Sequence, residues 1–180
     1  MRDRLVTRPL TAEWNTEFFQ QPCELTDEVR AEIRELDEAS ARLVWNELIR
    51  RNQYLHPKLL PRHHWSRHAT AVGPDWVAVW NRWIQREPGA DPIPEFLRTA
   101  VLWSSKVPVL FVTHRDRALL TNWGTFLAAW QHFMYSDEGP LLVSWERPEF
   151  VAWDVGGFVG VGVRSQMYAE QAAAPDRDGE

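Results

Sequence analysis

The spacing of apolar side chains changes near Lys106, and this change limits the folds that the chain can adopt. Before Lys106, apolar residues recur every three or four positions, which is the period of an amphipathic helix. After it come short runs of β-branched and aromatic residues, typical of strands, at 107–113, 141–145, 150–153 and 158–163. The order predicts an α+β fold: N-terminal helices packed on a small, mostly antiparallel C-terminal sheet, with one helix inserted after its first strand.

Residues that favour helix N-termini mark the first two helices. Thr26 precedes two acidic residues and predicts a helix start, with Val29, Ile33 and Leu36 on one face. Asp37 predicts a second start, before an amphipathic segment of about four turns. The pattern leaves open whether residues 26–52 form one helix or two.

The remaining segments alternate between loops and periodic stretches. Residues 1–24 are expected to form an irregular arm, and residues 53–73 a long loop with at most one helical turn. Pro74 and Asp91-Pro92 each predict a further helix start. Thr121 is expected to cap the most regular helix of the chain, which ends before a turn at 137–140.

Length and composition narrow the class of protein. A chain of 180 residues favours one domain, expected at 1–168, followed by a disordered tail at 169–180. A membrane span needs about 20 apolar residues, and the sequence has no such run. No secretory signal is evident, and the single cysteine, Cys23, fits a reducing compartment, so we expect a cytoplasmic protein. No motif predicts a cofactor.

Charge and aromatic content bear on the partner. The net charge is −5, from 20 basic and 25 acidic residues, and the acidic excess is concentrated after residue 120. A nucleic-acid-binding domain normally carries a concentrated basic face, so nucleic acid is not expected as the ligand. The 18 arginines and 11 tryptophans predict contacts between guanidinium groups and indole rings.

One stretch resembles a known family. Thr121-x-Trp123-Gly124-x-Phe126 continues to Trp130 and Phe133, and Asp137-Glu138-Gly139-Pro140 follows. Together with Pro9-Leu10, Trp14 and Trp45, this pattern is similar to a small bacterial family of unknown function over roughly residues 8–165. The resemblance implies the fold class and supplies no catalytic residues. The layout is also similar to that of immunity proteins that neutralise bacterial toxins, by analogy of architecture alone.

The preferred hypothesis is a non-catalytic protein-binding module, adaptor-like or immunity-like. Tryptophan is enriched at the centres of protein interfaces, and Trp76, Trp80 and Trp83 recur at helical spacing. Asp137 and Glu138, in the acidic last third of the chain, would attract a basic partner. The alternative for the three indoles is a place in the hydrophobic core. The oligomeric state is not indicated.

A rival hypothesis is an enzyme or small-molecule-binding protein with a histidine and arginine site. Four of the six histidines lie in the 53–73 loop, and His64 and His68 would share a face of a helix and bind zinc there. His114 and Arg115 follow the first predicted strand, where Asp137 or Glu138 could complete an acid–base pair. The plainer alternatives are a solvated loop at the first place and a charged turn at the second.

Overall fold

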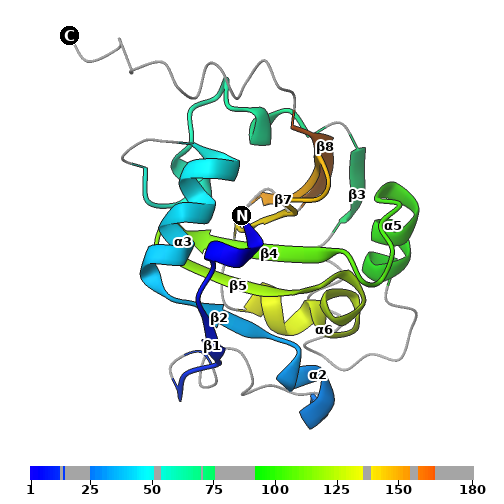
Figure 1. The fold of residues 1–180 in the computed structure, drawn as a ribbon. Helices are drawn as coiled ribbons and strands as arrows, with labels where there is room; N and C mark the ends of the chain where they lie inside the picture. Colours follow the sequence, from blue (N-terminus) through cyan, green and yellow to red (C-terminus); the bar gives the residue numbers. More distant parts are fainter. Residues whose placement is uncertain are drawn as a thin grey trace, which may run out of the picture.

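Helices and strands are both present in the computed structural model, which describes residues 1–12, 14, 25–50, 54–69, 71–75, 92–135, 139–154 and 158–164 (Figure 1). The helical elements are the 3-10 turns η1 (Arg2–Arg4), η3 (Pro57–Leu59) and η4 (Trp65–Arg67), the π-helical turn η2 (Trp45–Ile49), and the α-helices α2 (Asp27–Ala31), α3 (Glu38–Val44), α5 (Pro92–Ala100) and α6 (Trp123–Tyr135). The strands are β1 (Thr7–Pro9), β2 (Arg34–Leu36), β3 (Ala71–Asp75), β4 (Pro108–His114), β5 (Arg117–Asn122), β6 (Leu141–Val143), β7 (Glu149–Asp154) and β8 (Phe158–Val163). This composition confirms the predicted α+β class. None of the helices within these ranges has the length and the apolar character needed to cross a lipid bilayer.

The strands form one eight-stranded sheet in the order β1-β2-β5-β4-β6-β7-β8-β3. Every neighbouring pair is antiparallel, and β6, β7 and β8 form a meander. The expectation of a small C-terminal sheet was wrong in extent, because β1, β2 and β3 from the first half of the chain extend it at both sides. The inserted helix, α6, follows the β4–β5 hairpin rather than a single strand.

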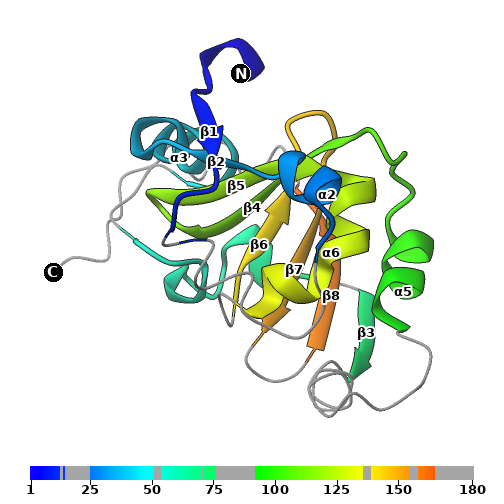
Figure 2. The same ribbon diagram turned by 90° about the horizontal axis from the view of Figure 1, so that it is seen from below.

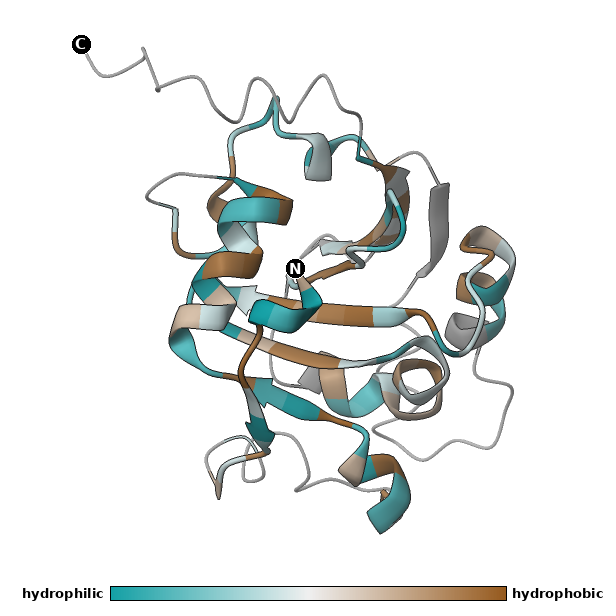
Figure 3. Ribbon diagram, viewed as in Figure 1, coloured by the Kyte–Doolittle hydropathy of each residue, from teal (hydrophilic) through white to brown (hydrophobic). Residues whose placement is uncertain are grey.

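Both faces of the central strands are buried. Along β4, Val109 and Phe111 belong to the core on the α6 side of the sheet, whereas Leu110 and Val112 belong to the core on the α3 side. This alternation follows from the period of two in a strand. Figure 2 shows α3 on one side of the sheet and α2, α5 and α6 on the other. Figure 3 shows apolar residues over most of β4 and β5 and polar residues over much of β1 and β2.

The N-caps predicted at Thr26 and Asp37 are confirmed. The Thr26 hydroxyl accepts from the Val29 N–H at 3.4 Å, and the Asp37 carboxylate accepts from the Ser40 N–H at 2.8 Å. The open question about residues 26–52 is answered by two separate helices. The expectation that Val29, Ile33 and Leu36 share a helix face was wrong, because residues 34–36 form β2 between β1 and β5.

Two further expectations were wrong, for similar reasons. Thr121 lies in β5 and caps no helix; the side-chain oxygen of Asn122 accepts from the Thr125 N–H at 2.9 Å instead. Pro74 lies in β3, where a helix start was expected. In both places, pairing with another strand decided the local structure: β5 pairs with β4, and β3 pairs with β8. The helix start at Asp91-Pro92 is confirmed by α5.

The two outermost strands each contain a proline. β1 includes Pro9, and β3 includes Pro74. The pairing of β3 with β8 also shifts its register between Val72 and Asp75. A proline has no N–H to give to a neighbouring strand, so its natural place in a sheet is at an edge.

The predicted contact between a guanidinium group and an indole is present. The Cζ atom of Arg117 lies 3.9 Å from the centre of the Trp14 ring. Trp14 is buried in the α6-side core, so this contact fastens the turn end of β5 to the N-terminal segment.

Candidate functional site

The segment 54–69 contains two histidine-capped turns. His56 precedes η3, and its Nδ1 accepts from the Lys58 N–H at 3.0 Å. His64 precedes η4, and its Nδ1 accepts from the Ser66 N–H at 3.2 Å. The expected long loop is therefore built from two short 3-10 turns, each fixed by the ring that precedes it.

His64 is enclosed by protein. Its side chain is 4 % exposed, and its Nε2 lies 3.1 Å from the backbone oxygen of Ile49. A carbonyl oxygen only accepts, so Nε2 carries the hydrogen and Nδ1 is the acceptor. Burial lowers the pKa of His64 to about 4, against a smaller raising effect of the Ile49 hydrogen bond. The neutral ring thus ties the segment to η2, with both nitrogens already engaged.

Ser66 and His64 have the spacing of a nucleophile and its base. The Ser66 Oγ lies 2.8 Å from His64 Nδ1, and the Ile49 oxygen orients the ring. Two observations favour a capping role instead. A histidine with a pKa of about 4 is a weak general base near neutral pH. His56 makes the same backbone hydrogen bond to Lys58, which has no hydroxyl.

The other rival-site residues lie in different surroundings. His68 is exposed at the end of η4. The His114 ring meets the His56 ring edge-on, with their centres 5.0 Å apart. The Arg115 N–H donates to the Leu55 oxygen at 2.7 Å, which joins the β4–β5 turn to the segment 54–69. Among the residues that the structure describes, no group of three or more His, Cys, Asp or Glu side chains is placed to hold a metal ion.

The preferred binding residues fall outside the described ranges. Trp76, Trp80, Trp83, Asp137 and Glu138 are not among the described residues, so their grouping stays a prediction. Of the eight tryptophans that the structure does describe, seven are buried, and one is half-buried: Trp14, Trp45, Trp65, Trp103, Trp123, Trp130 and Trp153 are buried, and Trp145 is half-buried. Trp123 and Trp130, which belong to the pattern that resembles the family, therefore lie in the core.

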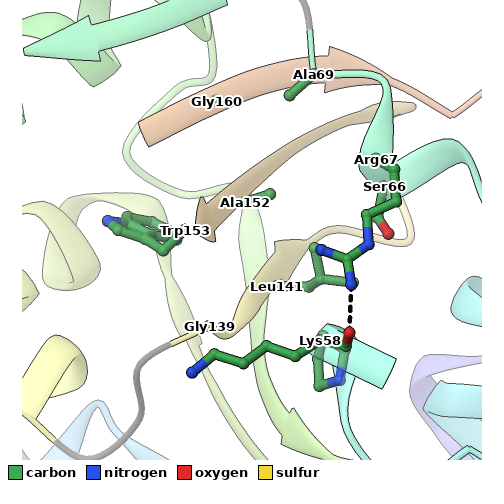
Figure 4. Close-up of a pocket in the computed structure, with 10 residues that line it drawn as sticks. Lys58, Ser66, Arg67, Ala69, Gly139, Leu141, Ala152, Trp153 and Gly160 are labelled. Carbon is green, nitrogen blue, oxygen red and sulfur yellow. Dashed lines mark hydrogen bonds between the residues drawn. The ribbon is translucent and has the colours of Figure 1, made fainter. Parts of the chain in front are cut away.

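A cavity of about 360 Å³ lies between the segment 54–69 and the α3 face of the sheet. We call it the loop cavity. Its floor is a row of residues paired across three strands, Leu141 with Ala152 and Ala152 with Gly160. Figure 4 shows the wall opposite, which comes from the loop. The wall residues that line it are Pro57, Lys58, Ser66, Arg67 and Ala69, and Gly139 and Trp153 complete the lining.

The next row of the same face shows why this one is hollow. There Phe150 is paired with Gly162, and its buried ring meets the Trp65 ring with centres 4.7 Å apart. That row is filled by two aromatic rings. Ala152 and Gly160 carry almost no side chain, and both stay partly exposed although they lie within the sheet. Small residues next to large ones thus leave room for a ligand.

Two cationic side chains stand at the cavity wall. The Arg67 guanidinium donates to the backbone oxygens of Lys58 and Leu60, the latter at 3.4 Å from Nε (Figure 4). The Lys58 side chain runs along Gly139, where a Cβ would lie 2.7 Å from Lys58 Cγ. Sequence reasoning missed this site, because its residues come from four distant segments. The one feature of the sequence that hints at the site is glycine within the strand predicted at 158–163, since a glycine in a strand indicates close packing or a gap.

A family model for proteins of unknown function (DUF2947) matches residues 11–162. The chain belongs to this family. The match confirms the resemblance drawn from the sequence, though not the individual motif positions. No curated protein and no solved structure matches the chain. The function of this DUF2947 member therefore has to be argued from its own geometry.

The structure gives physical reasons for two residues of the DUF2947 chain that the sequence singled out. Gly124, at the start of α6, donates its N–H to the Ser105 oxygen at 2.9 Å, and a Cβ there would lie 3.0 Å from Ser105 Cβ. Gly139 leaves the space that the Lys58 stem occupies. One glycine thus fixes the start of the helix, and the other shapes the loop cavity.

Proposed function

We propose that this protein is a non-catalytic binding protein that holds a small organic molecule in the loop cavity. The observation that carries the proposal is the partly exposed pair Ala152 and Gly160, next to the row that the Phe150 and Trp65 rings fill. A volume of about 360 Å³ lies within the range of small-molecule sites. This favours the small-molecule alternative over a protein partner, at a site different from the histidine and arginine site first considered.

The lining defines the chemistry of the ligand. Leu141, Ala152 and Pro57 offer an apolar surface, which suits the apolar body of a ligand. Lys58 and Arg67 add positive charge at the wall, which suits a polar or acidic end. Ser66 has the one hydroxyl group among the lining residues. This hydroxyl lies within hydrogen-bond distance of His64, as part of the histidine-capped turn. A binding role therefore accounts for the lining without a chemical step.

The test uses N-phenylnaphthylamine, an uncharged dye that fluoresces when it leaves water for an apolar site. Ala152→Leu fills the floor of the cavity, so we expect dye affinity to fall by about tenfold or more, or about 1.4 kcal/mol. The matched control is Ala39→Leu, at an exposed position of α3, which should leave binding unchanged. Equal dye binding by the parent protein and Ala152→Leu would reject the loop cavity as the site.

A second measurement addresses the natural ligand. Native mass spectrometry of the protein purified from its own cells should show an added mass of a small molecule, and that mass should be missing from Ala152→Leu. If the added mass persists in Ala152→Leu, the molecule is bound elsewhere, and the proposal fails.

A further inference from the structure

A second hollow lies near the N-terminus, at the end of the β4–β5 hairpin that contains Pro108 and Asn122. Its volume is about 470 Å³, and it shares no lining residue with the loop cavity. We call it the N-terminal hollow. Five segments build it: η1, the start of β2, the turn that leads into β4, the end of β5, and the loop between β6 and β7. The lining side chains that matter below are Arg2, Arg34, Lys106, Leu120 and Trp145.

Trp145 lines this hollow on a loop that is held in place. The Arg164 guanidinium donates to the backbone oxygens of Ser144 and Arg147, on both sides of the indole. The backbone N–H of Arg164 donates to the Pro148 oxygen at 2.8 Å. The Ser144 hydroxyl accepts from the backbone N–H of Glu146 at 3.1 Å. Among the tryptophans that the structure describes, Trp145 alone is half-buried rather than buried. The fold therefore presents one indole to the hollow on a fixed support.

The hollow also carries a small excess of positive charge. Within the described part of the chain, Arg2, Arg34 and Lys106 make no ion pair within 4.0 Å. Two carboxylates line the same hollow, Glu32 and Glu146, and Glu32 accepts from the Asn122 amide at 3.2 Å. Three cations against two anions leave an excess of one positive charge in a chain whose net charge is −5.

We propose that the N-terminal hollow binds a planar aromatic molecule that carries one anionic group, a phosphate or a carboxylate. The ring would stack on the Trp145 indole, beside the apolar Leu120, because aromatic stacking tolerates any flat ring. The anionic group would take charge-assisted hydrogen bonds from Arg2, Arg34 and Lys106. The volume suits a ligand of mononucleotide size. This site is independent of the loop cavity and of the function proposed for it.

Calorimetric titration of the whole protein tests both halves of the ligand. Adenosine monophosphate supplies ring and charge, adenosine lacks the charge, and inorganic phosphate lacks the ring. We expect adenosine monophosphate to bind at least about tenfold more tightly than either control, a difference of about 1.4 kcal/mol. Indole acetate, with indole as its uncharged control, is the arm that distinguishes a carboxylate ligand from a phosphate ligand.

Variants then locate the site. Arg34→Gln and Trp145→Leu should each weaken binding of the preferred anion by about tenfold. Arg98→Gln, an exposed arginine of α5 outside the hollow, and Ala152→Leu in the loop cavity should leave it unchanged. The proposal is overturned if neither aromatic anion binds at millimolar concentration. It is also overturned if inorganic phosphate binds as tightly as adenosine monophosphate, or if Trp145→Leu binds normally while its thermal unfolding matches the parent.

Discussion

The Phe150 ring lies across Gly162, its partner on the neighbouring strand. A Cβ at position 162 would stand 2.6 Å from both Cε1 and Cζ of the ring, and 3.3 Å from the Ala69 Cα. The ring cannot move away, because it is fully buried and meets Trp65 edge-on. Because Gly162 on β8 has no side chain, the two aromatic rings can form a layer on the α3 face of the sheet.

Gly162→Ala should lower the free energy of unfolding by about 1–3 kcal/mol, because it adds a methyl group to a filled layer. Urea denaturation measures the change. In a Phe150→Leu background the same substitution should cost much less, since leucine lacks the two ring atoms that clash. Equal costs in the two backgrounds would show that the contact does not limit position 162.

The buried His64 makes stability depend on pH. Its pKa is 6.5 when unfolded and about 4 when folded, so the unfolded chain binds the proton first. The stabilising contribution is complete above pH 6.5 and falls as the pH drops toward 4. The difference between these two pKa values corresponds to about 3 kcal/mol. Urea denaturation at a series of pH values should show this slope.

His64→Asn is the matching control for that slope. Asparagine can still accept from the Ser66 N–H but does not titrate, so the variant should lose less stability between pH 6.5 and 4 than the parent. Parallel pH profiles of the two proteins would mean that His64 is not the group responsible.

Glu35 fastens β1 to β2. Its carboxylate accepts from the Arg8 guanidinium at 2.7 Å and from the Thr11 N–H at 3.2 Å. Burial alone would raise the pKa of Glu35, but these bonds outweigh it and lower the pKa. Glu35→Gln should cost about 1 kcal/mol at neutral pH, since Arg8 is half-exposed. The cost should shrink in acid, as the parent carboxylate becomes protonated.

Glu38→Gln serves as the comparison for Glu35. Glu38 pairs with Arg42 on the exposed surface of α3, and such pairs contribute at most about 0.5 kcal/mol. Thermal unfolding of the two variants should separate them clearly. Equal effects would place the Glu35 bond among ordinary surface pairs.

Gly139→Ala should reshape the loop cavity through Lys58. The new methyl group would lie where the Lys58 stem now runs, and that flexible stem can move at little cost. We expect the affinity for N-phenylnaphthylamine to change by several fold while stability stays within about 1 kcal/mol of the parent. With Lys58→Ala in place, Gly139→Ala should have no additional effect on dye affinity; an undiminished effect would exclude Lys58 as the cause.

Local signals in the sequence predicted the features that depend on near neighbours. Asp37 capped its helix as expected, since the bond to Ser40 spans three residues. β5 was missed because its partner strand, not its own composition, gives residues 117–122 their extended shape. The same holds for β2, whose three residues continue the helical spacing of Val29 and Ile33.

The candidate site was beyond sequence reasoning for a related reason. The loop cavity depends on the strand pairing that places Ala152 beside Gly160. The residues next to either one in the sequence do not indicate that register. The sequence singled out His64 as a candidate zinc ligand, yet its surroundings in the fold give it a capping role. The indoles chosen for binding fall outside the described ranges, so that choice stays a prediction.

Pro9 and Pro74 have a consequence for copies of the protein that meet at high concentration. Each outermost strand lacks one of the amides that a further strand would need, and β3 is also irregular in register. A second chain would find an incomplete template on either flank. We therefore expect the sheet to resist growth into fibrils by strand addition, even though its central strands are strongly apolar.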